Sequence, residues 1–437
     1  MGLGNAHLTR VPLVTVDEQL ALRPSDRQLL EVLRHRGDMD RVGLARLSGL
    51  PRSTVTDSVA RLHKLGLVLE STRPAAAKKG PGRPASVIAI APPAGVIGVL
   101  WLTHESLHAG VLGLDGTLHA RHALDPYAHS STSPLAGPGV ALLNEALAAT
   151  PRTMGEMRCL IVGMPMPISA DQNLAASAAN ASALGSTIVA PYLPADPSSE
   201  LAQALDVPVW LENDANLAAL GEGALGAATE MPSFIYIKVV HGIGAGLVLN
   251  HRLHRGARGL AGELAHMHVE DGGTMCRCGG RGCLMTTFSQ RHLADRVRAV
   301  HPDVSSMADV MSLAAHGDAG VARLLRDLGR TIGRSLAEFC IYVAPDGIVI
   351  DGVLQNAATP VIEGIREAMY QFAPPAIASQ VQIVAGALAD RAELHGAAVL
   401  ARYKMYDHDL LSRPPMFERV QNHAAPHIDT GKASERY

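Results

Sequence analysis

Three of the five cysteines in this 437-residue chain lie close together near its middle. Cys276, Cys278 and Cys283 are separated by one and by four residues, and glycines fill the turns between them. Such turns can fold three sulfurs around one centre. Clustered thiols in a chain otherwise sparing of cysteine indicate metal binding before they indicate disulfides. A metal centre of this kind fixes the path of the chain around it.

A histidine completes the predicted metal-ligand set. His266 lies ten positions before Cys276 and gives three sulfurs and one nitrogen, a set that suits tetrahedral zinc. His268 competes for the fourth position. Four protein ligands leave no position for water, so we predict a structural Zn²⁺ that organises the loop 259–285. The alternative is a group of free surface thiols.

Length and composition point to a globular protein of two or three domains. The chain is too long for one ordinary core, and 47% hydrophobic with 18% charged residues is typical of soluble proteins. Its N-terminus lacks the apolar run of a signal peptide, and prolines interrupt the best apolar run, Val87–Leu102. We therefore expect a cytoplasmic protein that does not contact the membrane.

The net charge of -3 conceals an uneven distribution. Residues 24–84 hold 12 Lys and Arg against 6 Asp and Glu, whereas the rest of the chain holds 26 against 35. A basic segment attached to an acidic body is typical of proteins in which one domain binds a polyanion.

Within the basic segment the apolar spacing predicts three helices. Ser25 or Asp26 can cap the first, a short second helix covers 42–47, and the third begins near Pro51–Ser53 after a tight turn. This is the helix-turn-helix layout, in which the last helix enters the major groove of DNA. Two short strands around a polar hairpin, 71–86, predict a wing.

The predicted partner of this module is double-stranded DNA. The third helix offers polar side chains to base edges, and the hairpin offers cations to phosphate or the minor groove. These candidate contacts are Arg52, Ser53, Thr54, Thr56 and Arg61 on the helix and Lys78, Lys79 and Arg83 in the hairpin. The alternative is a three-helix protein–protein module with a solvated basic face.

After residue 95, short β-rich runs alternate with helical segments, which predicts an α/β body. The segments 95–116 and 233–253 resemble each other, since each predicts a strand, a tight turn and a strand. We therefore expect a two-lobed fold in which one such hairpin begins each lobe. Gly242, Gly244 and Gly246 in the second hairpin either expose amides that cradle phosphate or serve turn geometry alone.

Between the hairpins, VPVWLENDANL predicts a buried strand that runs into a helix. A carboxylate at this point can accept a proton from a substrate hydroxyl. Alternatively, Asn213 or Asp214 caps the helix, which the spacing favours.

The stretches GLAGELAHMHVEDGGTMCRCGGRGC and ENDAN resemble the zinc signature and the catalytic-loop motif of the ROK family (repressors, open reading frames, kinases). The resemblance implies an α/β fold: an N-terminal winged helix-turn-helix followed by a two-lobed, actin-like, hexokinase-type domain. It also implies a homodimer or a dimer of dimers. The expected boundaries are an N-terminal extension 1–22, the winged helix 23–91, the ROK domain 92–404 and a polar tail 405–437.

Residue by residue, the resemblance implies a sugar site. Asn213 and Asp214 would hold sugar hydroxyls, and Asp214 stands at the position of the base in kinase members. Glu263 would contact the sugar. His266 would bind zinc with one ring nitrogen and face the sugar with the other.

Departures from the family pattern fall mainly where a nucleotide would lie. The first phosphate loop is replaced by LWLTHES (100–106), the second reads VHGIG, and Asp351 replaces a glycine. Phosphoryl transfer depends on positioned charge, so we expect no catalytic residue and a vestigial Asp214. Met285 replaces a sugar-binding glutamate, which is compatible with an altered ligand or with none.

The sequence therefore predicts a DNA-binding transcription regulator whose kinase-like domain senses a sugar or sugar phosphate without phosphorylating it. Two alternatives stay open. One is an active sugar kinase with an attached DNA-binding domain, and the other is a zinc-stabilised scaffold without a ligand.

Overall fold

The structure of the chain is a computed structural model. The residues it describes are 23–36, 38–64, 67–72, 86–90, 95–103, 106–114, 116–124, 135–169, 171–172, 174–184, 196–239, 243–288, 290–351, 354 and 357–406. The predicted hairpin cations Lys78, Lys79 and Arg83, and Gly242 of the second hairpin, lie outside the described residues.

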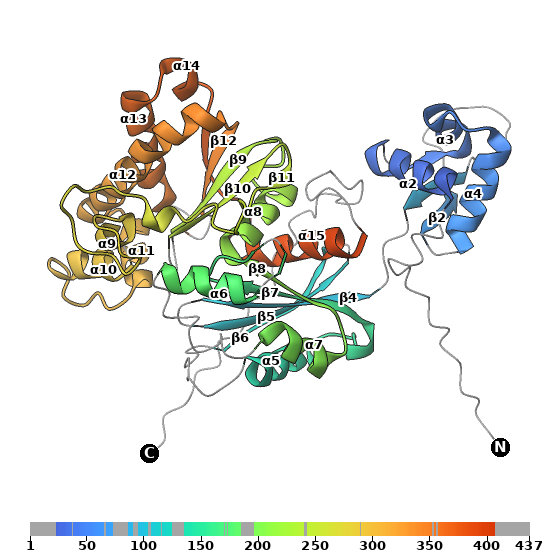
Figure 1. Ribbon diagram of the computed structural model, residues 1–437, viewed down its shortest axis with the longest axis horizontal. Helices are drawn as coiled ribbons and strands as arrows, with labels where there is room; N and C mark the ends of the chain where they lie inside the picture. The colour runs from blue at the N-terminus through green and yellow to red at the C-terminus, as the bar shows by residue number, and fades with distance from the viewer. Residues whose placement is uncertain are drawn as a thin grey trace.

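The basic segment forms a small unit of three helices and a three-stranded sheet, drawn in blue in Figure 1. Its helices are α2 (Pro24–Arg36), α3 (Arg41–Ser48) and α4 (Arg52–Lys64). Its strands, β1 (Met39–Asp40), β3 (Ser86–Ile90) and β2 (Val68–Thr72), pair antiparallel in that order. The three predicted helices are thus confirmed. Leu29, Leu33, Leu44, Val55, Val59 and Leu62 are among the side chains of their common core.

Local signals set the turn between α3 and α4. The Asp40 carboxylate accepts a hydrogen bond from the Gly43 amide and caps α3. Gly49 ends the helix with φ of 70°, a left-handed conformation that favours glycine. Two ion pairs then join the elements: Arg61 on α4 to Asp26 on α2, and Arg41 on α3 to Glu70 on β2.

The rest of the described chain contains two five-stranded sheets with the same topology. The first has the order β6-β5-β4-β7-β8 and the second β11-β10-β9-β12-β13. In each sheet, the first three strands along the chain pair antiparallel. The fourth strand pairs in parallel with the first, and the fifth pairs in parallel with the fourth. The two predicted hairpins are β4–β5 and β9–β10, and each opens one sheet, so the two-lobed prediction is confirmed.

The strand bounds follow the apolar runs of the sequence. Those of the first sheet are β4 (Val96–Leu102), β5 (Leu107–Gly113), β6 (Leu118–Leu124), β7 (Met157–Met164) and β8 (Val209–Asn213). Those of the second are β9 (Phe234–Lys238), β10 (Gly244–Leu249), β11 (Arg252–Leu253), β12 (Gly347–Ile350) and β13 (Gln382–Ala385).

Helices cover both sheets. Near the first sheet lie α5 (Ala136–Ala148), η1 (Met154–Glu156), α6 (Leu174–Ala183) and α7 (Pro197–Leu205). The second lobe holds η2 (Leu264–His266), α9 (Leu284–Phe288), α10 (Gln290–Arg298), α11 (Met307–Ala315), α12 (Ala319–Val343), α13 (Ala358–Phe372) and α14 (Pro375–Ala378). No helix among the described residues is long and apolar enough to cross a membrane.

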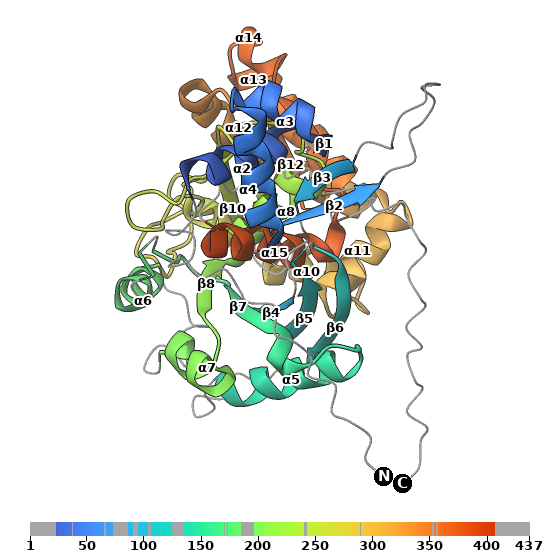
Figure 2. The ribbon, with the colours of Figure 1, turned by 90° about the vertical axis from the view of Figure 1, so that its right-hand side faces the viewer.

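Two helices lie between the sheets, α8 (Asp214–Leu225) and α15 (Ala392–Tyr406), the latter after the short η4 (Ala389–Arg391) (Figures 1 and 2). They share one apolar core with strands of both sheets. Their contact is close, because a Cβ on Gly396 would lie 1.7 Å from the Leu217 carbonyl oxygen. Glycine is therefore required where α15 crosses α8, and the first turns of both helices are brought to the space between the lobes.

Candidate functional site

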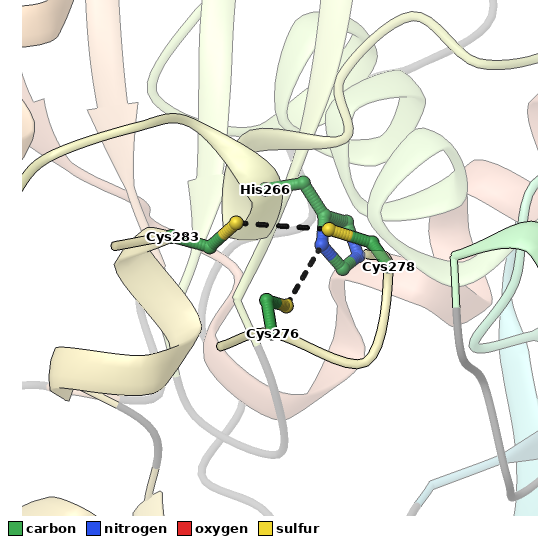
Figure 3. Close-up of side chains that lie close together, drawn as sticks. All are labelled: His266, Cys276, Cys278 and Cys283. Atoms are coloured by element: carbon green, nitrogen blue, oxygen red, sulfur yellow. Dashed lines mark hydrogen bonds between the residues drawn. The ribbon is translucent and has the colours of Figure 1, made fainter. Parts of the chain in front are cut away.

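The four predicted metal ligands converge in the structure. His266, Cys276, Cys278 and Cys283 place their ligand atoms within 4.8 Å of one another (Figure 3). The distance from the Cys276 sulfur to His266 Nδ1 is 3.6 Å, and that between the Cys278 and Cys283 sulfurs is also 3.6 Å. Tetrahedral zinc with Zn–S bonds of about 2.3 Å separates its ligand atoms by about 3.8 Å. The donor set therefore fits a tetrahedral metal ion.

The structure also decides between the two histidines. His268 is not part of the cluster and lies 3.7 Å from Asp271 at the surface. His266 faces the cluster through Nδ1, which leaves Nε2 on the other side of the ring. Burial and the neighbouring sulfurs raise the pKa of Cys283 to about 12. A divalent cation would remove that cost, because it stabilises thiolates.

Asn213 caps α8, as the spacing favoured. Its Oδ1 accepts a hydrogen bond from the Asn216 amide at 3.0 Å, and its Nδ2 donates to the Met166 carbonyl at 3.1 Å. The side-chain oxygen and nitrogen of Asn213 each retain one further hydrogen-bonding position, since an amide oxygen has two lone pairs and an NH₂ group has two protons. The cap thus fixes the amide and still allows a ligand contact.

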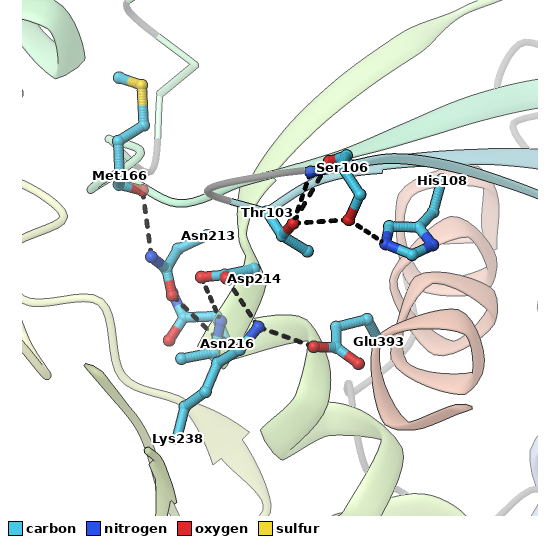
Figure 4. Close-up of polar contacts among 10 residues, drawn as sticks. Thr103, Ser106, His108, Met166, Asn213, Asp214, Asn216, Lys238 and Glu393 are labelled. Carbon is cyan, nitrogen blue, oxygen red and sulfur yellow. Dashed lines mark hydrogen bonds and ion pairs between the residues drawn. The ribbon is translucent and has the colours of Figure 1, made fainter. Parts of the chain in front are cut away.

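Asp214, the first residue of α8, is paired with a buried lysine that the sequence did not reveal. Lys238 Nζ lies 2.7 Å from Asp214 Oδ2 and 2.8 Å from Glu393 Oε1 (Figure 4). The three side chains are 6%, 9% and 11% exposed. Lys238 ends β9 and Glu393 lies in the first turn of α15, so one ammonium joins three elements.

Asp351 adds a third carboxylate near this ammonium. The charges of Asp214, Glu393 and Asp351 outweigh the burial of Lys238 and raise its pKa well above the ordinary value. Tyr236 also hydrogen-bonds Asp351, and burial together with that carboxylate raises the tyrosine pKa. The negative charge of Asp351 is therefore buried in a local network, where Lys238 partly compensates it.

Glu263 lies beside this network, immediately before η2. Burial and then the negative charge of Asp214 raise the pKa of Glu263 to about 7. Glu263 thus lies near enough to Asp214 for their charges to interact, and the short η2 connects it to His266.

The raised pKa of Glu263 makes stability depend on pH. A carboxyl group that is harder to ionise in the folded chain destabilises it as pH rises from about 4.5 towards about 7. We therefore expect Glu263→Gln to stabilise the protein by about 1–3 kcal/mol at pH 8 and by under about 1 kcal/mol at pH 5. Denaturant unfolding of both proteins at each pH measures the difference. An equal gain at both pH values would contradict a charge effect.

The turn between β4 and β5 is closed by its own hydrogen bonds. Thr103 Oγ1 lies 2.7 Å from Ser106 Oγ, which lies 2.7 Å from His108 Nε2 (Figure 4). The Ser106 amide donates to Thr103 Oγ1 and the Thr103 amide to the Ser106 carbonyl. This turn stands where the resemblance places a phosphate loop, and these two amides are already engaged.

The described glycines of the second hairpin lie in a strand that packs against α8. Gly244 and Gly246 lie within β10, and a Cβ on Gly246 would lie 2.5 Å from the Ala219 side chain of α8. Close packing of strand and helix therefore explains Gly246, and neither residue lies in an open phosphate-binding turn. Glu212, in the same motif as Asn213, is buried against Arg255 and positions β8.

On the N-terminal unit, the predicted DNA contacts divide into two groups. Arg52, Ser53 and Thr56 are exposed at the start of α4, and Thr54 is half-buried. Arg61 instead binds Asp26 Oδ1 at 2.7 Å and Ser58 Oγ at 2.8 Å, so it holds α4 against α2. Sequence reasoning missed this internal partner, because Asp26 lies 35 residues away.

Comparisons with known proteins agree with this architecture. The xylose repressor of Bacillus subtilis is 25% identical over 353 residues, which are 80% of this chain and 87% of that protein. The glucokinase of Thermotoga maritima is 29% identical over 223 residues, 48% of this chain and 70% of that enzyme. A crystal structure of a ROK family transcriptional regulator, a homologue of the E. coli MLC protein, aligns with a TM-score of 0.69 and 22% identity, covering 89% of this chain and 96% of that chain.

The family model described as ROK family matches residues 104–404. This segment contains the second sheet, the first sheet apart from β4, the four clustered metal-ligand residues and Asp214 at the start of α8. The fold is therefore of the mixed α/β, actin-like kinase type, and the chain belongs to the ROK family.

Proposed function

We propose that the chain is a DNA-binding transcription regulator whose kinase-type body senses a sugar and does not phosphorylate it. The observation that carries the proposal is the attachment of a basic three-helix unit to this body. The match to the xylose repressor spans 353 residues, more than the segment 104–404 contains, whereas the glucokinase match covers 48% of the chain. The relatives whose match to this chain extends beyond the kinase-type body are thus named as repressors.

The three-helix unit has the form of a winged helix-turn-helix. Asp40 and Gly49 set the ends of α3, so that α4 follows after a tight turn, and β2 and β3 form the base of a wing. We place base contacts on Arg52, Ser53, Thr54 and Thr56, because Arg61 would have to leave Asp26 to reach DNA. Lys78, Lys79 and Arg83 of the hairpin are proposed to reach phosphate or the minor groove.

Removal of one exposed arginine tests the DNA-binding half. Arg52→Ala is expected to weaken binding to the DNA upstream of the protein's own gene by about tenfold, because a base contact is worth about 1–3 kcal/mol. Fluorescence anisotropy and footprinting measure this loss. Arg323→Ala, an exposed arginine on α12, is the control and should leave affinity unchanged. Salt-insensitive binding, or equal loss in both variants, would contradict the interface.

The absence of phosphoryl transfer is proposed from the state of Asp214. A general base must be free to reach the hydroxyl proton that it accepts, and both carboxylate oxygens of Asp214 already accept hydrogen bonds, one from the Lys238 ammonium and one from the Ala215 amide. Lys238 holds Asp214 in this state, and the self-bonded turn at Thr103 and Ser106 replaces a phosphate loop. Asp214 is then a hydrogen-bond acceptor for a ligand hydroxyl.

The second candidate function is an active sugar kinase with a DNA-binding unit. It is favoured by the retained aspartate at the start of α8 and by the glucokinase relatives at 29% identity. A coupled assay for nucleotide consumption with D-glucose and D-xylose separates the two. We expect no turnover above that of Asp214→Asn. Steady product formation that this substitution abolishes would establish the kinase instead.

The metal is proposed to be Zn²⁺ in a structural role. Three sulfurs and one nitrogen fill a tetrahedral shell, so no position remains for a substrate or water. His266 Nε2 is left to face the ligand beside Glu263. We further propose a homodimer or a dimer of dimers, since paired winged helices read paired half-sites in DNA.

A further inference from the structure

The sulfurs of the metal-ligand cluster differ in how far solvent can reach them. Cys276 and Cys283 are each 3% exposed, whereas Cys278 is half-buried. The two residues that follow Cys278, Gly279 and Gly280, are exposed. Within this cluster, Cys278 is therefore the sulfur that a small molecule in solution meets first.

The backbone holds the accessible cysteine and its nearest sulfur partner in different ways. Cys283 lies at the base of the loop, where it forms an antiparallel bridge with His268. Cys278 lies in a tight turn, which is closed by a hydrogen bond of 3.0 Å from the Gly279 amide to the Cys276 carbonyl. The sulfur of an exposed turn thus lies beside a sulfur that is fixed at the base of the loop.

Cys278 and Cys283 are close enough to be joined by a small movement. Their sulfurs lie 3.6 Å apart (Figure 3). A disulfide bond is about 2.05 Å long, so the sulfurs need to approach by only about 1.5 Å. Gly279, with φ of 87°, begins the four-residue connection between them, and no described atom lies within 4 Å of the place where its Cβ would be. The turn therefore has room to move.

We propose that Cys278 is a site of oxidation by hydrogen peroxide, and that Cys283 resolves the oxidised sulfur into a disulfide and so releases the metal. This inference rests on the proposed zinc site and adds a chemical modification to it. Cysteines that sense oxidants are accessible thiolates with a second cysteine close by. Cys278 and Cys283 meet this description, because a bound zinc ion holds its cysteine ligands as thiolates.

The reaction balances with one peroxide molecule for each disulfide. The Cys278 thiolate attacks one peroxide oxygen, the O–O bond breaks, and the sulfur becomes a sulfenic acid while hydroxide leaves. The Cys283 thiolate then attacks this sulfur, so that an S–S bond forms, the S–O bond breaks and a second hydroxide leaves. Two protons from solvent convert both hydroxides to water. Two electrons pass from the two thiolates to the peroxide.

The disulfide removes two of the four ligands, and Cys276 with His266 is too small a set to hold zinc tightly. The same loop carries Glu263 directly before η2. Oxidation is therefore expected to loosen the segment from which Glu263 and His266 are presented, and reduction in the presence of zinc should restore it.

Treatment of the full-length, zinc-loaded chain with hydrogen peroxide tests the proposal. A chromophoric zinc chelator follows metal release, and peptide mass spectrometry after thiol alkylation locates the new bond. We expect release of about one equivalent of zinc per chain together with a Cys278–Cys283 disulfide, and reversal of both by dithiothreitol with added zinc. Cys159 and Cys340, each 0% exposed, should remain thiols and serve as internal controls.

A change of ligand type supplies the matched variant. Cys278→His leaves two sulfurs and two nitrogens, a set that also suits tetrahedral zinc, and removes the accessible sulfur. Peroxide should therefore release zinc from this variant at least about tenfold more slowly. Cys340→Ala is the control and should release zinc at the rate of the unchanged chain. If Cys278→His does not load zinc, the bond located in the unchanged chain decides the matter.

The remaining outcomes separate this inference from the metal assignment. A chain that binds no zinc would overturn both. A chain that keeps its zinc through peroxide treatment would overturn the inference and leave the metal assignment intact. The same holds if zinc is lost with a sulfinic acid on Cys278, or with a bond from Cys278 to Cys276, in place of the expected disulfide.

Discussion

Replacing Lys238 with methionine is expected to destabilise the protein by about 3–5 kcal/mol, because it leaves buried carboxylates without their ammonium. Asp214 and Glu393 would lose contacts of 2.7 and 2.8 Å, and both lie where α8, α15 and β9 meet. Chemical unfolding followed by circular dichroism measures the loss. The loss should diminish in mild acid, since protonation removes the uncompensated charge.

Two further variants distinguish this charge effect from simple loss of packing. Arg330→Met breaks an exposed ion pair with Glu367 and should cost about 0–1 kcal/mol. Adding Asp214→Asn and Glu393→Gln to Lys238→Met should recover much of the loss, because neutral amides replace the unpaired carboxylates. A triple variant no more stable than Lys238→Met would show that the charges do not carry the effect.

Loss of the metal is the second change with a large expected effect. The purified chain should hold one zinc ion, and Cys278→Ser should reduce this content and lower the melting temperature by about 10 °C. The binding free energy of the metal is expected to stabilise the loop 259–285, because the ion would hold together four ligand residues contributed by this loop. Elemental analysis and differential scanning calorimetry measure both quantities.

A cysteine outside the cluster provides the control for this experiment. Cys340 is fully buried in the core of the second lobe, away from the predicted ligands. Cys340→Ala should retain the zinc, although it loses some packing. If Cys278→Ser retained a full equivalent of zinc, or if a chelator left the melting temperature unchanged, the metal assignment would be wrong.

Much of the fold follows from local sequence signals. The three N-terminal helices follow from apolar spacing and from residues that favour helix ends, such as Asp40 and Gly49. The two hairpins that open the sheets follow from alternating apolar runs around short turns. The Asn213 cap follows from a polar residue between a buried strand and a helix. In each case the partners are neighbours in sequence, so spacing alone is informative.

Other parts of the site depend on contacts between distant residues. Lys238 meets Asp214 across 24 residues and Glu393 across 155, and it looks like an ordinary strand residue in the sequence. Arg61 looks like a DNA contact until Asp26, 35 residues away, is placed beside it. A lysine at the end of the apolar strand FIYIK is the signal that could have prompted a search for a buried partner.

The sequence by itself determined the kinds of element, the repeated hairpins and the group of residues able to bind a metal, because these depend on spacing along the chain. The tertiary structure decided that His266 and not His268 joins the sulfurs, that Asp214 is held by an ammonium, and that Arg61 turns inward. These outcomes depend on which side chains meet when two lobes and the helices between them pack. Charge and burial at such meeting points arise only in the folded chain.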